Sequence, residues 1–175
     1  MNRKSNGVGK PVRVKITGEA VTAGQEMGKQ AGGPKKLGEA GSPIQERAYA
    51  DRKDLTDVVI VEGVTGIGNL AFTDSSLETL VIPSSVTEIG EGAFRGCTSL
   101  RSVVIPEDVT EIGPGAFEGC TSLASVTIPS SVTEIGDSAF EGCTSLSMAR
   151  VPAGLKVSKV SQFKDCPALD KIQRY

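Results

Sequence analysis

The chain has 175 residues, a net charge of −2, no tryptophan and no histidine. Only 4% of its residues are aromatic, too few to fill a compact core with bulky side chains, so a thin and repetitive core is expected. No apolar stretch is long enough for a signal peptide or a membrane helix, which predicts no membrane insertion and, by default, a cytoplasmic location.

Residues 1–36 form a polar arm that is rich in glycine and lysine and holds ten charged residues. Such a segment cannot bury enough apolar surface to offset the entropy of ordering, so we expect it to be disordered. The alternative is one short strand from Val12 to Ile16, where apolar residues alternate. The arm is basic, but its cations are scattered among glutamates and no aromatic residue precedes Tyr49, so nucleic-acid binding is not expected.

Residues 37–54 are predicted to be a degenerate N-terminal half-turn of a repeat. Ile44, Ala48 and Tyr49 stand one repeat length before Ile67, Ala71 and Phe72. Terminal turns of a solenoid must cover the core and usually depart from the consensus.

Residues 55–168 consist of five repeats of 22 or 23 residues. The three central repeats, which start at Leu77, Leu100 and Leu123, read LETLVIPSSVTEIGEGAFRGCTS, LRSVVIPEDVTEIGPGAFEGCTS and LASVTIPSSVTEIGDSAFEGCTS. Residues 169–175 are expected to form a truncated C-terminal strand. A fixed period of this length with leucine at the strand positions is typical of a leucine-rich repeat.

Within one repeat, Leu80 and Ile82 are predicted to face inward on a short strand while Thr79 and Val81 face outward. Pro83 should end the strand because it lacks an amide hydrogen. A corner or a second short extended piece is expected to follow. Glycines then allow tight turns before Ala93 and Phe94 return to the interior.

The repeats resemble the BspA-like, treponemal-type leucine-rich repeats, in the pattern LxxLxIPxSVTxIGxxAFxGCxS that begins at Leu77, Leu100 and Leu123. The resemblance implies a right-handed solenoid of short parallel β-strands joined by irregular or 3-10 turns. It also implies a family with many surface proteins that bind host or matrix proteins. This chain departs from such members in showing no export signal or anchor.

Four cysteines recur at the repeat spacing and should lie one above another: Cys97, Cys120, Cys143 and Cys166. We interpret them as buried free thiols that act as small apolar groups. Disulfides are the alternative, although side chains in register point parallel to each other. A metal site is a weaker alternative because the chain has no histidine and its cysteines are not paired as CxxC.

Glu88, Glu111 and Glu134 form a second column. A repeated glutamate beside an inward isoleucine indicates the solvated side of the coil, and the alternative is a weak surface for a cation or a basic partner.

The outward positions of the predicted sheet are the other candidate surface, although Thr, Ser and Val are also what β propensity selects. Together with the three glutamates, the predicted partner-binding residues are Thr79, Val81, Ser102, Val104, Ser125, Thr127, Met148 and Arg150. Asp57, Val59, Lys171 and Gln173 continue this face.

These patterns favour a non-enzymatic protein–protein interaction module with an unidentified protein partner, which the acidic repeats suggest is basic. The alternative is a structural spacer, or a fragment of a larger cell-surface, adhesin-like protein. No nucleophile–base pair and no metal ligand set is visible, so we predict no catalytic residues and no cofactor.

Overall fold

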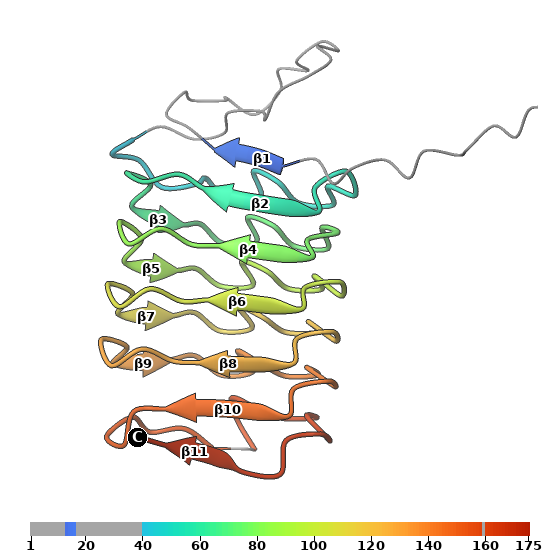
Figure 1. The fold of residues 1–175 in the computed structure, drawn as a ribbon, viewed down its shortest axis with the longest axis vertical. Coiled ribbons are helices and arrows are strands. Elements are labelled where there is room, and N and C mark those ends of the chain that lie inside the picture. Colours follow the sequence, from blue (N-terminus) through green and yellow to red (C-terminus); the bar gives the residue numbers. More distant parts are fainter. Residues whose placement is uncertain (1–12, 17–39, 159) are drawn as a thin grey trace, which may run out of the picture.

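The computed structural model describes residues 40–158 and 160–175 together with the backbone of residues 13–16. The chain winds as a stack of turns, each with a strand on one side (Figure 1). The strands are β1 (Arg13–Ile16), β2 (Asp57–Ile60), β3 (Gly66–Ile67), β4 (Thr79–Val81), β5 (Glu88–Ile89), β6 (Ser102–Val104), β7 (Glu111–Ile112), β8 (Ser125–Thr127), β9 (Glu134–Ile135), β10 (Met148–Val151) and β11 (Ile172–Arg174).

Two parallel sheets run along the stack. The first, which we call the front sheet, has the order β1-β2-β4-β6-β8-β10-β11, and the second has the order β3-β5-β7-β9. From β2 onward, each strand pairs with its copy in the neighbouring turn, as Leu80 does with Val103 in the front sheet and Ile89 with Ile112 in the second. The second short extended piece expected after Pro83 is therefore a strand, and the expected solenoid of parallel strands is confirmed.

The rest of each turn is an arc of irregular turns, and the described residues contain no helix. Alternate amides on the arc bond to the next turn, as Phe94 N does to Ala116 O at 2.8 Å. The amides between them bond locally, as Arg95 N does to Gly92 O at 3.0 Å. The arc therefore satisfies its backbone without regular secondary structure.

The core is a set of columns that run along the stack. Neighbouring phenylalanine rings are stacked with centroids 5.1 to 5.3 Å apart, from Phe72 to Phe163. Leu80 and Ile82 are buried together with their counterparts in the next turns. The predicted interior stack of Phe94, Phe117 and Phe140 is confirmed.

The N-terminal part of the front sheet differs from the sequence expectation. Residues 13–16 form β1 and pair with β2, so the expectation of disorder does not hold for these four residues. The alternative of a short strand in this region applies to them instead. The other residues of the predicted arm, 1–12 and 17–36, lie outside the described residues.

Residues 40–54 form a partial turn that packs on the N-terminal side of the first complete one. Ile44 makes a parallel bridge to Ile67, and the Tyr49 ring stacks on Phe72 with centroids 5.1 Å apart. The partial turn thus extends the ring column by one side chain and covers Phe72.

Candidate functional site: the outer face of the front sheet

The front sheet places every second side chain on an outer face, because successive residues of a strand point to opposite sides. In β4, Leu80 is buried while Thr79 and Val81 are exposed. The same alternation holds in β6, β8 and β10. The outer face therefore presents the residues predicted from the sequence, namely Thr79, Val81, Ser102, Val104, Ser125, Thr127, Met148 and Arg150.

This face carries exposed apolar side chains: Val59, Val81 and Val104 form a column in register, which we call the stripe, and Met148 lies in the neighbouring column, in register with Ser125. Val59 is 37% exposed, Val81 51%, Val104 68% and Met148 43%. They are four of the six large hydrophobic side chains that are exposed among the described residues. Single exposed hydrophobic residues are ordinary, but their concentration on one sheet face is typical of a contact surface.

An aromatic side chain that sequence reasoning missed lies beside Arg150, which is two strands beyond Val104 on the same sheet face. The Arg150 guanidinium carbon is 5.4 Å from the centroid of the Tyr175 ring. The Tyr175 hydroxyl donates a hydrogen bond of 2.7 Å to the Ile128 carbonyl oxygen, and the residue remains 47% exposed. The strand register could have indicated this contact, because Gln173 pairs with Arg150 and Tyr175 follows Gln173 by two residues.

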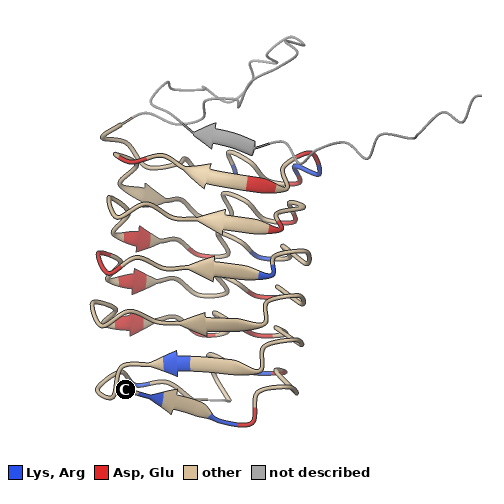
Figure 2. Cartoon of the chain, viewed as in Figure 1, with Lys and Arg blue, Asp and Glu red and all other residues tan. Residues whose placement is uncertain are grey.

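The predicted glutamate column lies on the second sheet, away from the apolar stripe. Glu88 pairs in register with Glu111, and Glu111 with Glu134, and all three side chains are exposed. Figure 2 shows them as acidic segments on β5, β7 and β9. Within residues 40–158 and 160–175 no ion pair involves any of the three. This column is therefore a negative strip that the described part of the chain does not neutralise.

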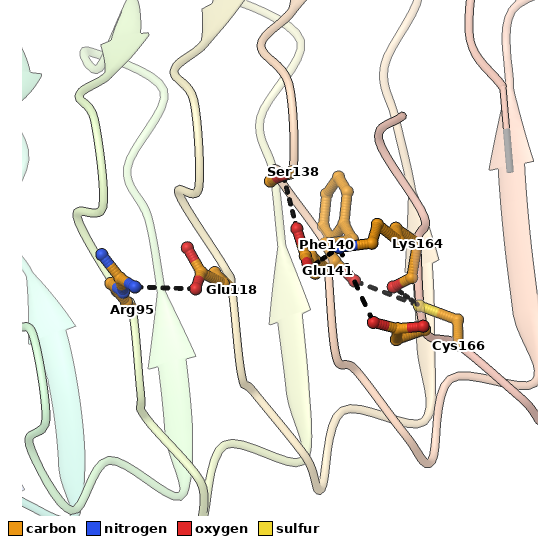
Figure 3. A network of polar contacts seen from close by, with 8 residues as sticks. Arg95, Glu118, Ser138, Phe140, Glu141, Lys164 and Cys166 are labelled. Atoms are coloured by element: carbon orange, nitrogen blue, oxygen red, sulfur yellow. Dashed lines mark hydrogen bonds and ion pairs between the residues drawn. The ribbon is translucent and has the colours of Figure 1, made fainter. Parts of the chain in front are cut away.

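A second charged column on the arc is internally compensated (Figure 3). Arg95 pairs with Glu118 at 2.8 Å, and Lys164 with Glu141 at 2.7 Å. The hydrogen bonds from Lys164 and from the Ser138 hydroxyl lower the pKa of Glu141, and the bond to Glu141 raises the pKa of Lys164. Because these carboxylates already have partners, they are poor candidates for recognition.

The four cysteines are free and buried, as the preferred interpretation held. Each thiol also has a polar role that the sequence did not reveal, because it donates to the carbonyl oxygen of a phenylalanine in the preceding turn. The distance is 3.2 Å from Cys120 to Phe94, and 3.1 Å from Cys166 to Phe140. Burial raises the pKa of Cys97 to about 11 and that of Cys143 to about 12, so these two thiols stay neutral and unreactive at neutral pH.

The described part of the chain holds no group of three or more side chains that could bind a metal ion. It also holds no helix long and apolar enough to cross a membrane.

Comparison with known proteins agrees with this architecture. No curated protein matches the chain significantly. Among solved structures, a leucine-rich repeat protein of Treponema pallidum is 28% identical with a TM-score of 0.72, over 95% of this chain and 71% of that one. One from Bacteroides ovatus is 26% identical with a TM-score of 0.65, over 93% and 45%. A leucine-rich cell surface protein of Faecalibacterium prausnitzii is 34% identical with a TM-score of 0.66, over 72% and 34%.

The chain thus spans less than half the length of the last two proteins. Residues 42–173 match, in six copies, the family described as the BspA type leucine-rich repeat region. The match covers the arc, both sheets from β2 onward and the buried columns that form the repeat. The chain therefore belongs to the BspA-type leucine-rich repeat family.

Proposed function

We propose that this protein is a non-enzymatic binding module that holds a protein partner on the outer face of its front sheet. The observation that carries the proposal is the exposed stripe of Val59, Val81 and Val104, with Met148 exposed on the same sheet face. A partner that covers it would gain roughly 25 cal/mol for each Å² of apolar surface removed from water.

The C-terminal end of the same sheet face offers an anchor. Arginine and tyrosine are enriched among the residues that dominate binding energy in interfaces, and Arg150 and Tyr175 lie together there. The bond from Tyr175 to Ile128 holds the ring in place, which reduces the entropy lost when a partner packs against it.

A basic partner fits the electrostatics of the middle turns. Residues 77–145 contain ten acidic residues and two basic ones, and Glu88, Glu111 and Glu134 have no internal counter-charge among the described residues. Exposed ion pairs contribute about 0 to 1 kcal/mol each and are screened by salt, so this strip would act mainly on the association rate.

The experiment is affinity capture with matched variants. The double variant Val81→Lys/Val104→Lys places two charges on the stripe without touching a buried side chain. The control Thr98→Lys adds a charge at an exposed position of the arc. We expect the double variant to lose the partner and the control to retain it.

Salt dependence tests the basic partner separately. Binding should weaken as ionic strength rises, and changing Glu88, Glu111 and Glu134 together to Gln should reduce that dependence. Binding that is unchanged or strengthened by salt would exclude the electrostatic contribution. Equal capture by the double variant and the control would exclude the front sheet as the binding face.

The second candidate is a structural spacer, or a segment of a larger adhesin-like protein at the cell surface. The similarity to a cell surface protein of Faecalibacterium prausnitzii, of which this chain spans only 34%, favours it. Under this alternative the repeats set a length and the contacts lie elsewhere. No specific partner for the wild-type chain would then be captured.

A further inference from the structure

The last turn departs from the repeat in the positions that elsewhere form the core. Ser158 stands one repeat after the buried Ile135, and Gln162 one repeat after the buried Ala139. Arg174 pairs in register with the buried Val151 but is itself exposed. Three apolar columns therefore end in polar side chains at one end of the solenoid.

These replacements line an open depression of about 550 Å³. Its walls come from the segment 153–158, from Ser161 and Gln162, and from Arg174 on β11. Two of the lining side chains, Lys156 and Arg174, are positively charged, and no lining residue is an aspartate or a glutamate.

The polar groups in the depression are held by the backbone. Arg174 Nη1 donates to the carbonyl oxygens of Pro152, Ala153 and Leu155 at 3.4, 3.2 and 2.8 Å. The buried Gln162 accepts from Ser158 N at 3.0 Å. The guanidinium is thus fixed in orientation, while its Nε and Nη2 donate to no residue in the described part of the chain. A preorganised donor binds an anion with little loss of entropy.

The sequence of the C-terminal part of the chain is basic as well. Residues 146–175 contain six basic and two acidic residues, in contrast to the acidic middle turns. Neither Lys156 nor Arg174 makes an ion pair with a carboxylate among the described residues. A terminal turn needs polar side chains for solubility, but that need does not require two unpaired cations in one depression.

We propose that the depression lined by Lys156, Ser158, Gln162 and Arg174 binds a small oxyanion, a phosphate or a carboxylate group. Arg174 would supply the fixed donors and Lys156 a mobile counter-charge. The site lies at the end of the solenoid, and its four side chains are not among the residues of the proposed partner surface.

The test is an NMR titration of the full chain with inorganic phosphate, and in a second arm with acetate, each against sodium chloride at equal ionic strength. Saturable shifts are expected at the amides of Leu155 and Ser158 and at the Arg174 side chain. Saturation by phosphate alone would identify a phosphate site, and saturation by acetate alone a carboxylate site.

Lys156→Gln should weaken binding roughly fivefold, the effect of removing one partly exposed ion pair. It changes an exposed side chain without a hydrogen bond to the fold, so folding should be preserved. Lys171→Gln, at the same end but outside the depression, is the matched control and should bind as the wild type does. Chemical-shift changes equal to those produced by sodium chloride would overturn the proposal. Equal losses of anion affinity in Lys156→Gln and Lys171→Gln would also overturn it.

Discussion

Replacing Gly113 with alanine should destabilise the solenoid strongly, because this position lies against the backbone of the preceding turn. A Cβ atom added there would lie 2.7 Å from Glu91 N and 2.7 Å from Gly90 C. Neither atom can rotate away, so the two turns would have to move apart. That movement would strain the bond of 2.8 Å from Gly113 N to Ile89 O.

The expected cost combines overpacking, about 1 to 3 kcal/mol, with the partial loss of a hydrogen bond of about 1 kcal/mol. Urea denaturation followed by circular dichroism should therefore show a loss of about 2 to 4 kcal/mol. Gly154→Ala is the matched control, since a Cβ at that position meets nothing within 4 Å and its φ is not left-handed. It should be neutral, or stabilising by up to about 1 kcal/mol. Equal changes in the free energy of unfolding for Gly113→Ala and Gly154→Ala would refute the close approach of the turns.

Four further outcomes follow from the contacts described above. Phe117→Ala should cost about 3 to 5 kcal/mol in urea denaturation, because it removes a fully buried ring from the middle of the ring column. Asp165→Gly should stabilise by roughly 0.5 to 1 kcal/mol, because Asp165 has a φ of 53° at a position where the three preceding turns have glycine. Lys164→Gln should raise the pKa of Glu141 toward its ordinary 4.5 in a carboxyl NMR titration. Since the folded pKa of Glu141 is depressed, the stability that Lys164→Gln removes should be largest above pH 4.5 and should vanish as the pH falls through the folded value. In thiol labelling at pH 8, the native protein should react slowly, and Cys166, at 7% exposure, should react before the three fully buried cysteines.

The sequence predicts the stack well because its period fixes the register. When the same side chain recurs in every turn, the only alignment that buries all copies is the one that places them in columns. The ring column follows this rule in Phe94, Phe117 and Phe140. The front sheet follows it too, since Leu80 of β4 pairs with Val103 of β6. Inward and outward positions then follow from the alternation within each strand.

Features without a repeated copy could not be predicted in this way. Nothing in the period places residues 13–16 beside β2, because they belong to no repeat. The contact of Tyr175 with Arg150 depends on how the last strand ends. The thiol bonds to phenylalanine carbonyls were hidden for another reason. A buried cysteine has the same pattern whether it packs as an apolar group or donates a hydrogen bond, and only the geometry distinguishes the two.

A solenoid repeats the charge of any outward position at the strand spacing of about 4.8 Å. At that distance two like charges in water repel by close to 1 kcal/mol, so a column of one sign is costly unless it is compensated. The arc column places Arg95 beside Glu118 and Lys164 beside Glu141, which removes the cost within the molecule. The column of Glu88, Glu111 and Glu134 has no such cation among the described residues, so its repulsion would be relieved by an external positive group. A basic partner would therefore gain both attraction to each carboxylate and relief of the repulsion between them, and this second gain distinguishes this column from the scattered acidic residues of the turns.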